Sequence, residues 1–286
     1  PSHPRRTTTC FRANKLTLYI FYMNRIDRCF ERLKDESKKG FIAYIGAGDP
    51  NLESTKNITL ELAQSGVDII ELGVPFSAPL ADGLVNQLAA QRGLQSGTTI
   101  EGVLQTVEAI REKSDIPIVL YIYYNLIHRR GLEDFIQTAA KCGVDGLLTL
   151  DLPPEEADNY ELIMTQSGMN SIWLIAPTTP EERIKVIAER GSGFIYYVSR
   201  EGVTGMRQDV VTQLKDRVDI IRKYTNLPIA VGFGISTPSQ VRQVSADCDA
   251  VVVGSAIVDR IGKGGQNPSL AVEIGSFTKE LSSGLR

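Results

Sequence analysis

Residues 65–72 read "SGVDIIEL" and residues 142–150 read "CGVDGLLTL", so one pattern occurs twice in the chain. In each copy, a glycine that can end a helix precedes a short apolar run. A second pair, "DIPIVLYI" (115–122) and "NLPIAVGF" (226–233), repeats another version of that run. Such recurrence predicts a fold assembled from one repeated helix–strand unit.

Apolar runs of strand length alternate with longer helical patterns along the chain, and Gly, Pro or Asp separates them. The predicted strands are residues 41–45, 67–72, 116–122, 145–150, 171–176, 193–198, 227–232 and 249–254. Runs this continuously apolar are typical of parallel strands covered by helices on both faces. The sequence therefore predicts an α/β fold, a (β/α)8 TIM barrel. A Rossmann-like sheet is disfavoured because no GxGxxG follows the first strand.

The 286 residues allow one domain or two. No linker or low-complexity stretch interrupts the series, so we expect a single catalytic barrel domain over residues 23–286. Its extra N-terminal helix is expected within "MNRIDRCFERLKDESKKG" (23–40), which reads as a complete amphipathic helix.

Residues 1–22 differ from the rest because they contain no acid and four cations. We interpret them as an extension that is disordered or foreign to the native chain. They are either the remnant of an organelle transit peptide or upstream sequence translated ahead of Met23, and the second interpretation is favoured because the helix begins there. The apolar run at 16–23 is too short to span a membrane, so no membrane association is expected.

Composition excludes several classes of function. The formal net charge is −3 and no basic stripe is interleaved with aromatics, which argues against nucleic-acid binding. The four cysteines are scattered and the chain has only two histidines, His3 and His128, so we expect neither a metal site nor a disulfide framework. His128 lies beside two arginines and reads as a surface residue. A reducing, cytoplasmic location fits best, or a plastid or other organelle if residues 1–22 are a transit peptide.

Glycine-rich segments follow three of the predicted strands at the edge where barrel enzymes build their sites. They are "SREGVTG" (199–205), "GFGIS" (232–236) and "GSAI" (254–257). Small residues let backbone N–H groups approach an anion, and a following helix directs its positive end at it. One such loop alone is ordinary turn chemistry, but three at adjacent strand ends predict a phosphorylated ligand.

Two carboxylates, Glu71 and Asp82, lie in the otherwise apolar stretch "ELGVPFSAPLADG" (71–83). Glu71 is interpreted either as a strand-end acid paired with a backbone N–H or a distant arginine, or as a catalytic group. Asp82 is interpreted either as a cap of the helix "LVNQLAAQRG" (84–93) or as the second catalytic group. Two acids that bracket one apolar pocket suit acid–base work on a neutral organic group.

Aromatic and apolar residues at or near the ends of other strands predict a pocket for a flat ring, although each singly would also fit a core. They are Tyr44, Tyr121, Tyr123, Leu150, Ile175 and Tyr196.

These motifs resemble the tryptophan synthase α subunit family. The resemblance is carried by "ELGVPFSAPLADG", "AGDP" (47–50), "YVSREGVTG" (197–205), "GFGIS" and "VGSAIV" (253–258), and it extends from about Met23 to the end. It implies a barrel that cleaves indole-3-glycerol phosphate into indole and glyceraldehyde 3-phosphate without a cofactor or metal. It also implies a pyridoxal-phosphate β subunit that receives the indole in an αββα complex.

The resemblance assigns roles by position. Glu71 matches the family's catalytic Glu, which moves the proton to the ring carbon and helps deprotonate the side-chain hydroxyl. Asp82 matches the Asp that binds the indole N–H. The tyrosines and Ile175 match the indole pocket. The matches to the phosphate and substrate contacts are Thr204, Gly205, Phe233, Gly234, Gly254 and Ser255.

Four positions depart from the family's usual pattern. Ala78 replaces an acid that contacts the β subunit, and Leu84 replaces a proline. Gly46 replaces a threonine, a change expected to weaken the support around Asp82, and Tyr44 stands where phenylalanine is common. Three other functions stay open: a stand-alone lyase that releases indole, a non-catalytic activating subunit of a β enzyme, and an unrelated phosphosugar isomerase on the same fold.

Overall fold

The strands of the computed structural model, which describes residues 23–198, 208–232 and 234–285, form a closed barrel. Each strand pairs in parallel with the next, and β8 pairs with β1. The strands are β1 Gly40–Gly46, β2 Ile69–Gly73, β3 Ile118–Ile122, β4 Gly146–Thr149, β5 Asn170–Ile175, β6 Ile195–Val198, β7 Ile229–Gly232 and β8 Ala250–Val253. The predicted (β/α)8 barrel is therefore confirmed.

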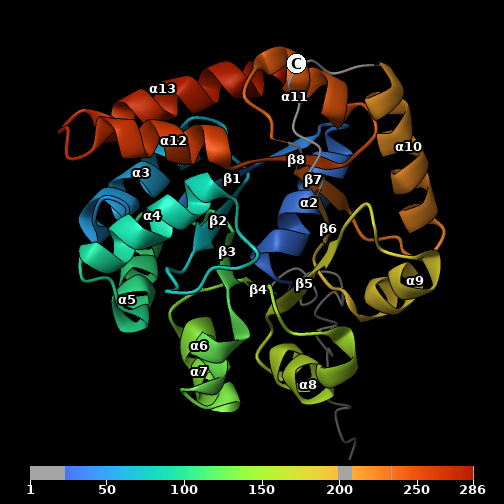
Figure 1. The fold of residues 1–286 in the computed structure, drawn as a ribbon, viewed down its shortest axis with the longest axis horizontal. Coiled ribbons are helices and arrows are strands. Elements are labelled where there is room, and N and C mark those ends of the chain that lie inside the picture. The colour runs from blue at the N-terminus through green and yellow to red at the C-terminus, as the bar shows by residue number, and fades with distance from the viewer. Residues whose placement is uncertain (1–22, 199–207, 233, 286) are drawn as a thin grey trace, which may run out of the picture.

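Helices form a ring around the strands (Figure 1). They are α2 Arg25–Asp35, α3 Leu52–Gln64, α4 Leu84–Gln95, α5 Ile100–Arg111, α6 Tyr124–His128, α7 Leu132–Lys141, α8 Asp158–Gln166, α9 Glu181–Arg190, α10 Gln208–Arg222, α11 Pro238–Ser245, α12 Ser255–Gly264 and α13 Leu270–Ser282, with 3-10 turns at Pro154–Glu156 and Ser283–Leu285. The last helix, α13, packs beside α3 and so closes the ring.

Every predicted strand exists, and the boundaries differ by one or two residues. Val67 and Ile116 were expected inside strands, but β2 and β3 begin two residues after them. Both side chains are buried, so burial in the connecting segments, rather than strand pairing, explains their apolar character.

Alternation along the strands separates two apolar layers. Ala43 and Ile45 of β1 belong to the large cluster that also contains helix residues, whereas Ile42 belongs to a second cluster inside the barrel. The interior cluster includes Ile69 of β2 and Val119 of β3. Side chains two residues apart in a strand share a face, so this register decides which residues can reach the barrel mouth.

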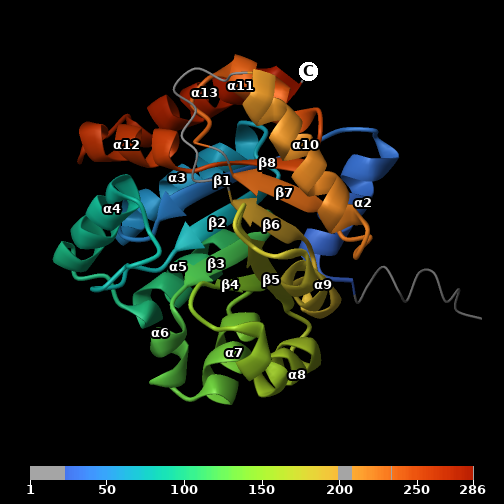
Figure 2. The same cartoon turned by 45° about the vertical axis from the view of Figure 1, so that its right-hand side comes forward.

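The extra N-terminal helix is present as α2, and it covers the amino-terminal end of the barrel (Figure 2). Its buried face, Ile26, Cys29, Phe30 and Leu33, joins the interior cluster. Asn24 caps α2 by accepting from the N–H of Ile26, and its side-chain amide donates to the carbonyl oxygens of Asp145 and Gly168. The helix therefore seals the end opposite the predicted site.

Aspartates that precede three strands tie the amino-terminal ends of the barrel together. Asp68, Asp145 and Asp249 each accept a backbone N–H from the preceding strand, at 2.8–2.9 Å; the donors are Phe41 of β1, Ile118 of β3 and Ile229 of β7. Each also pairs with arginine: Arg32 with Asp68, Arg111 and Arg25 with Asp145, and Arg222 with Asp249. The repeated "GVD" of the sequence thus has a structural role, because its aspartate links one repeat to the next.

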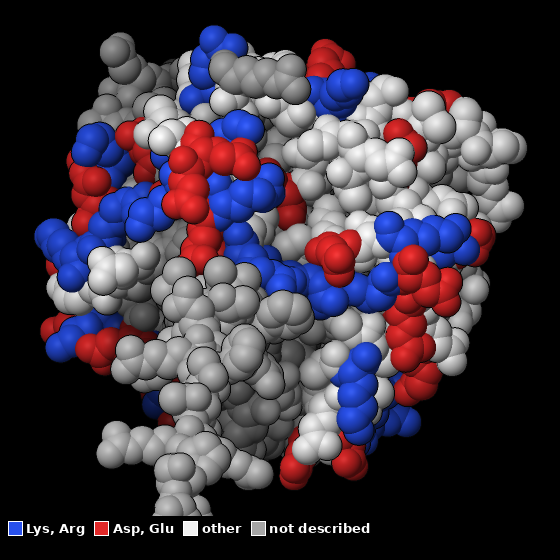
Figure 3. All heavy atoms as spheres, turned by 180° about the vertical axis from the view of Figure 1, so that it is seen from behind, with Lys and Arg blue, Asp and Glu red and all other residues white. Residues whose placement is uncertain are grey.

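The surface carries both signs of charge. From behind, Lys and Arg side chains lie next to Asp and Glu over the described part of that face (Figure 3). In the described ranges, none of the helices combines the length and the apolar character that a membrane span needs.

A buried ion pair fixes the loop after β1. Asp49 is 1% exposed, and Arg92 of α4 donates to both of its carboxylate oxygens at 2.8 and 2.7 Å. The pair joins that loop to the helix that follows Asp82, and so it supports one side of the barrel mouth.

We predict that Arg92→Met destabilises the fold by about 3–5 kcal/mol, because it leaves the buried Asp49 carboxylate without its counter-charge. Urea unfolding followed by circular dichroism measures this loss. Lys263→Gln breaks the exposed pair with Asp259 and serves as the control, with an expected change within about 0.5 kcal/mol. A loss below about 1 kcal/mol for Arg92→Met would contradict the prediction.

Candidate active site

Glu71 lies on the inward face of β2, because it follows Ile69 of the interior cluster by two residues. Its side chain is almost fully buried, and Oε2 has no hydrogen-bond partner among the described residues. Burial raises the pKa of Glu71 to about 8, and the negative charge of Asp82 adds to the shift. No ion pair links Glu71 to an arginine of the described chain, so the structural interpretation of this acid is not supported.

Two tyrosine hydroxyls hold Asp82. Tyr121 donates to Oδ1 at 2.8 Å and Tyr123 donates to Oδ2 at 2.7 Å. The Tyr123 hydroxyl also accepts the N–H of Ala81, and the ring of Phe76 stacks on the Tyr123 ring at 4.7 Å between centroids. The loop after β2 is therefore tied to Tyr121 of β3 and to Tyr123, the residue that follows β3 and caps α6.

The alternative interpretation of Asp82 as a helix cap is wrong. The N-cap residue of α4 is Gly83, and no side chain caps that helix. Since each carboxylate oxygen can accept two hydrogen bonds, the two tyrosines leave Asp82 able to accept a further donor.

Two more tyrosines lie over glycines of neighbouring strands. A Cβ at Gly73 would collide with the Tyr44 hydroxyl, and a Cβ at Gly232 would lie 2.6 Å from the Tyr196 hydroxyl. The Tyr44 ring meets the Tyr121 ring edge-on at 5.1 Å. Burial raises the pKa of both Tyr44 and Tyr196, and Glu71 contributes to each shift, so both hydroxyls stay protonated near this acid.

The ends of β7 and β8 differ in how their helices begin. Thr237 and Gln240 form a capping box on α11, which occupies donors at that helix N-terminus. By contrast, Gly254 precedes α12 with no side-chain cap, and Ser255 opens the helix with an exposed side chain. Gly234 is exposed and adopts a φ of +61°, a conformation that favours glycine. Of these two helices, α12 therefore offers the more open anion site.

The remaining predicted residues lie in different places. Leu150 packs against the interior cluster just after β4. Ile175 does not: it is fully buried and packs with the cluster between strands and helices, so the expectation that it lines the pocket is corrected. The physical reason is alternation, since Leu174, one residue earlier, packs with the interior cluster. Thr204, Gly205 and Phe233 lie outside the described residues.

Sequence reasoning missed two side chains of the site, Leu174 and Phe76. Counting in steps of two from Ile172 would have selected Leu174, because Ile172 belongs to the interior cluster. No local signal marks Phe76 as the neighbour of Tyr123, because 47 positions of sequence separate the stacked rings.

This arrangement suits proton transfer on an uncharged ring. One acid has a pKa near neutrality and a partnerless oxygen, and the other is held by hydroxyls with capacity for another donor. Tyr121, Leu174 and Tyr196 pack against the interior cluster, and α12 begins without a side-chain cap. Within residues 23–198, 208–232 and 234–285, no group of three or more His, Cys, Asp or Glu could hold a metal ion.

The family model described as "Tryptophan synthase alpha chain" matches residues 30–283. Among curated relatives, the tryptophan synthase alpha chain of Opitutus terrae is 48% identical over 92% of this chain and its own full length. That of Thermoanaerobacter sp. (strain X514) is 46% identical over 91% of this chain and 98% of its own.

Solved structures are similar as well. The tryptophan synthase subunit alpha of Legionella pneumophila str. Paris has a TM-score of 0.85 and 36% identity, covering 92% of this chain and 98% of its own. The tryptophan synthase A-subunit of Pyrococcus furiosus has a TM-score of 0.79 and 36% identity, covering 86% and 99%.

We predict that Glu71→Gln stabilises the protein relative to wild type increasingly as pH rises from about 4.5 to about 8. The folded pKa of Glu71 is raised above its ordinary value of 4.5, so wild-type stability from this group is complete below pH 4.5 and is lost as the pH approaches 8. Differential scanning calorimetry measures the difference in Tm across this range.

Glu101→Gln is the matched control. A hydrogen bond from Arg130 lowers the pKa of Glu101. The effect of Glu101→Gln on Tm should therefore be smaller, have the opposite sign and change with pH only below pH 4.5. A Tm difference for Glu71→Gln that stays constant between pH 4.5 and 9 would show that Glu71 is not a buried acid of raised pKa.

Proposed function

The chain belongs to the tryptophan synthase alpha chain family, and from this premise we propose that it cleaves indole-3-glycerol phosphate into indole and glyceraldehyde 3-phosphate. The observation that carries the proposal is the pair of acids: Glu71, buried with a partnerless oxygen, and Asp82, held by two tyrosines. Membership of the family supports a lyase in tryptophan biosynthesis. The arrangement of Glu71 and Asp82 supports the particular cleavage reaction.

Glu71 acts first as an acid. With its pKa raised to about 8, the carboxyl group is protonated near neutral pH and gives its proton to the ring carbon that bears the glycerol chain. The ring nitrogen then carries positive charge. Asp82 accepts the ring N–H and stabilises that charge through this hydrogen bond.

In the second step Glu71 regains a proton. Its carboxylate accepts the proton of the hydroxyl on the adjacent side-chain carbon, and a carbonyl forms there. The bond between that carbon and the ring carbon breaks, and its electrons restore the aromatic ring. Indole and an aldehyde result, so the step is a retro-aldol cleavage and needs no cofactor or metal of the α subunit.

The substrate's two ends have separate supports. Tyr44, Tyr121, Tyr123, Leu150 and Tyr196 enclose the ring, together with Leu174. The phosphate lies at the open N-terminus of α12, near Gly254 and Ser255, with the backbone of Gly234 beside it. Thr204, Gly205 and Phe233, which lie outside the described residues, match further phosphate and substrate contacts of the family motif.

A pyridoxal-phosphate β subunit is the proposed partner. Three leucines beside the mouth are unusually exposed: Leu80 at 90%, Leu84 at 70% and Leu88 at 44%. Exposed apolar side chains that cluster in sequence are typical of a surface covered by another protein. Ala78 provides no acid there, so we expect apolar contact rather than an ion pair to dominate at this loop. A cytoplasmic location stays a prediction.

The other functions are less well supported. A non-catalytic activating subunit would not need a buried acid with a raised pKa beside a second acid, and this chain keeps both. A stand-alone lyase would leave the leucines without a partner. The rate of cleavage with and without a β subunit separates these possibilities.

We predict that Glu71→Gln lowers kcat for cleavage of indole-3-glycerol phosphate by roughly 10²–10⁴-fold, the usual contribution of a general acid–base group. Indole release followed by spectrophotometry, with and without a tryptophan synthase β subunit, measures this effect. The wild type should accelerate when the β subunit is added, and the variant should stay slow in both conditions.

Glu133→Gln, an exposed glutamate on α7, is the control and should cleave at the wild-type rate. Near-normal cleavage by Glu71→Gln would refute the role of Glu71. A wild-type rate that is already high and does not change with the β subunit would favour the stand-alone lyase.

We also predict that Tyr121→Phe lowers kcat/KM by roughly tenfold, because Asp82 loses one of the two donors that orient it. Steady-state kinetics measure it, and we expect the loss mainly in kcat. Tyr224→Phe is the matched control, since the Tyr224 hydroxyl donates to Glu181 at 2.8 Å on the exposed surface. Unchanged kcat/KM in Tyr121→Phe would mean that Tyr123 alone positions Asp82.

A further inference from the structure

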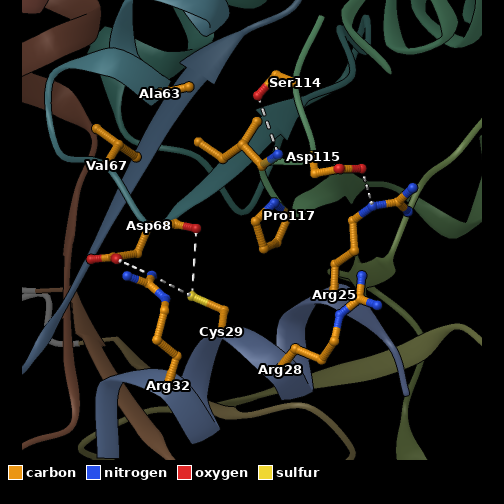
Figure 4. A pocket seen from close by; sticks show the side chains of 11 residues that line it. Arg25, Arg28, Cys29, Arg32, Ala63, Val67, Asp68, Ser114, Asp115 and Pro117 are labelled. Atoms are coloured by element: carbon orange, nitrogen blue, oxygen red, sulfur yellow. Dashed lines mark hydrogen bonds and ion pairs between the residues drawn. The ribbon is translucent and has the colours of Figure 1, made fainter. Parts of the chain in front are cut away.

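A cavity of about 400 Å³ lies at the amino-terminal end of the barrel, remote from the proposed active site. Three segments enclose it: one face of α2, the end of α3 with its connection to β2, and the connection from α5 to β3 (Figure 4). Its lining residues precede strands β2 and β3, whereas Glu71 and Asp82 come at or after a strand end. The cavity is thus a separate site on the molecule.

The floor of the cavity is apolar. Val67, Ile116 and Cys29 line it and are buried. Burial raises the pKa of the Cys29 thiol to about 11, so this group stays neutral. The floor therefore carries no charged group, and the apolar body of an organic molecule can pack against it.

The rim carries more positive than negative charge. Arg25, Arg28 and Arg32 extend from the same face of α2, since their spacing of three and four residues matches the helix repeat (Figure 4). Arg32 pairs with Asp68 at 2.8 Å and Arg25 pairs with Asp115 at 3.3 Å. Within the described part of the chain, Arg28 forms no ion pair, so one guanidinium on the rim lacks a counter-charge.

A second guanidinium group, that of Arg25, lies beside Arg28 (Figure 4). The Asp115 side chain is 89% exposed, so its pair with Arg25 Nε is a surface contact that another anion can replace. Ser114 lies on the side of the cavity opposite Arg28, where it accepts the N–H of Ile116 at 3.2 Å (Figure 4). Arg25 stays fixed during such an exchange, because its NH1 also donates to the buried Asp145 at 3.0 Å.

We propose that this cavity binds a small organic anion. Its carboxylate or phosphate group lies between Arg25 and Arg28, and its apolar body packs on the floor that includes Cys29 and Ile116. The contacts to the anionic group are charge-assisted hydrogen bonds, and Asp115 turns to solvent when the ligand enters. The site goes beyond the proposed cleavage reaction and does not depend on it.

The test uses phenyl phosphate as the probe and the full chain labelled with 15N-arginine. Nε–Hε correlation spectra follow each guanidinium, and the Arg25 and Arg28 signals are assigned by their disappearance in Arg25→Lys and Arg28→Lys. We expect saturable shifts of both signals. Arg28→Gln should weaken binding, read from the Arg25 signal, by roughly tenfold, whereas Asp115→Asn should strengthen it by up to about fivefold because a competing carboxylate is removed.

Arg129→Gln is the matched control, an exposed arginine elsewhere that should leave the affinity unchanged. Shifts at Arg25 that do not saturate, an equal response at Arg129, or weaker binding in Asp115→Asn would overturn the proposal. If phenyl phosphate bound only at the barrel mouth, the Arg25 and Arg28 signals would not shift, and this result would also overturn the proposal. Arg28→Gln should cleave indole-3-glycerol phosphate at the wild-type rate, so the outcome here is distinguishable from failure of the proposed reaction.

Discussion

A carboxyl group that is removed from water and has an oxygen without a partner must be protonated or compensated, and Glu71 is in this position. The barrel offers it tyrosines rather than cations. In the described chain, the arginines that pair with buried aspartates lie elsewhere: Arg25 and Arg111 bind Asp145 at the amino-terminal end of the barrel, and Arg92 of α4 binds Asp49. An arginine beside Glu71 would lower its pKa and remove the proton that the proposed reaction uses.

Asp82 depends on β3 rather than on its own surroundings in the sequence. Both carboxylate oxygens accept hydrogen bonds from Tyr121 and Tyr123. The expectation that Gly46 weakens the support around Asp82 stays a prediction. Gly46 allows close packing, since a Cβ there would lie 3.2 Å from that of Ala89 on α4. Tyr44 completes the support, because its ring packs edge-on against Tyr121.

Local patterns predicted much of this fold because they record burial directly. The apolar runs located all eight strands, and the repeated "GVD" marked the starts of β2 and β4. The same reasoning placed Ile175 on the wrong face, because its position at a strand end says nothing about the direction of its side chain. Alternation corrects it and selects Leu174. The partners of Asp82 were not predictable, since 39 and 41 residues separate it from the two tyrosines. The hydrogen-bonded ion pair between Asp49 and Arg92 joins positions 43 residues apart, so it was not predictable either.

The position of Asp82 and the protonation of Glu71 are linked. The charge of Asp82 adds to the effect of burial on the pKa of Glu71, so the proton on Glu71 depends on where the Asp82 carboxylate is held. Tyr121 and Tyr123 hold it: Tyr121 belongs to β3, and Tyr123 follows that strand at the start of α6. If the loop moved away from β3, Asp82 would lose both donors and its effect on Glu71 would weaken with distance. The two hydrogen bonds to Asp82 therefore orient one acid and also help to keep the other protonated.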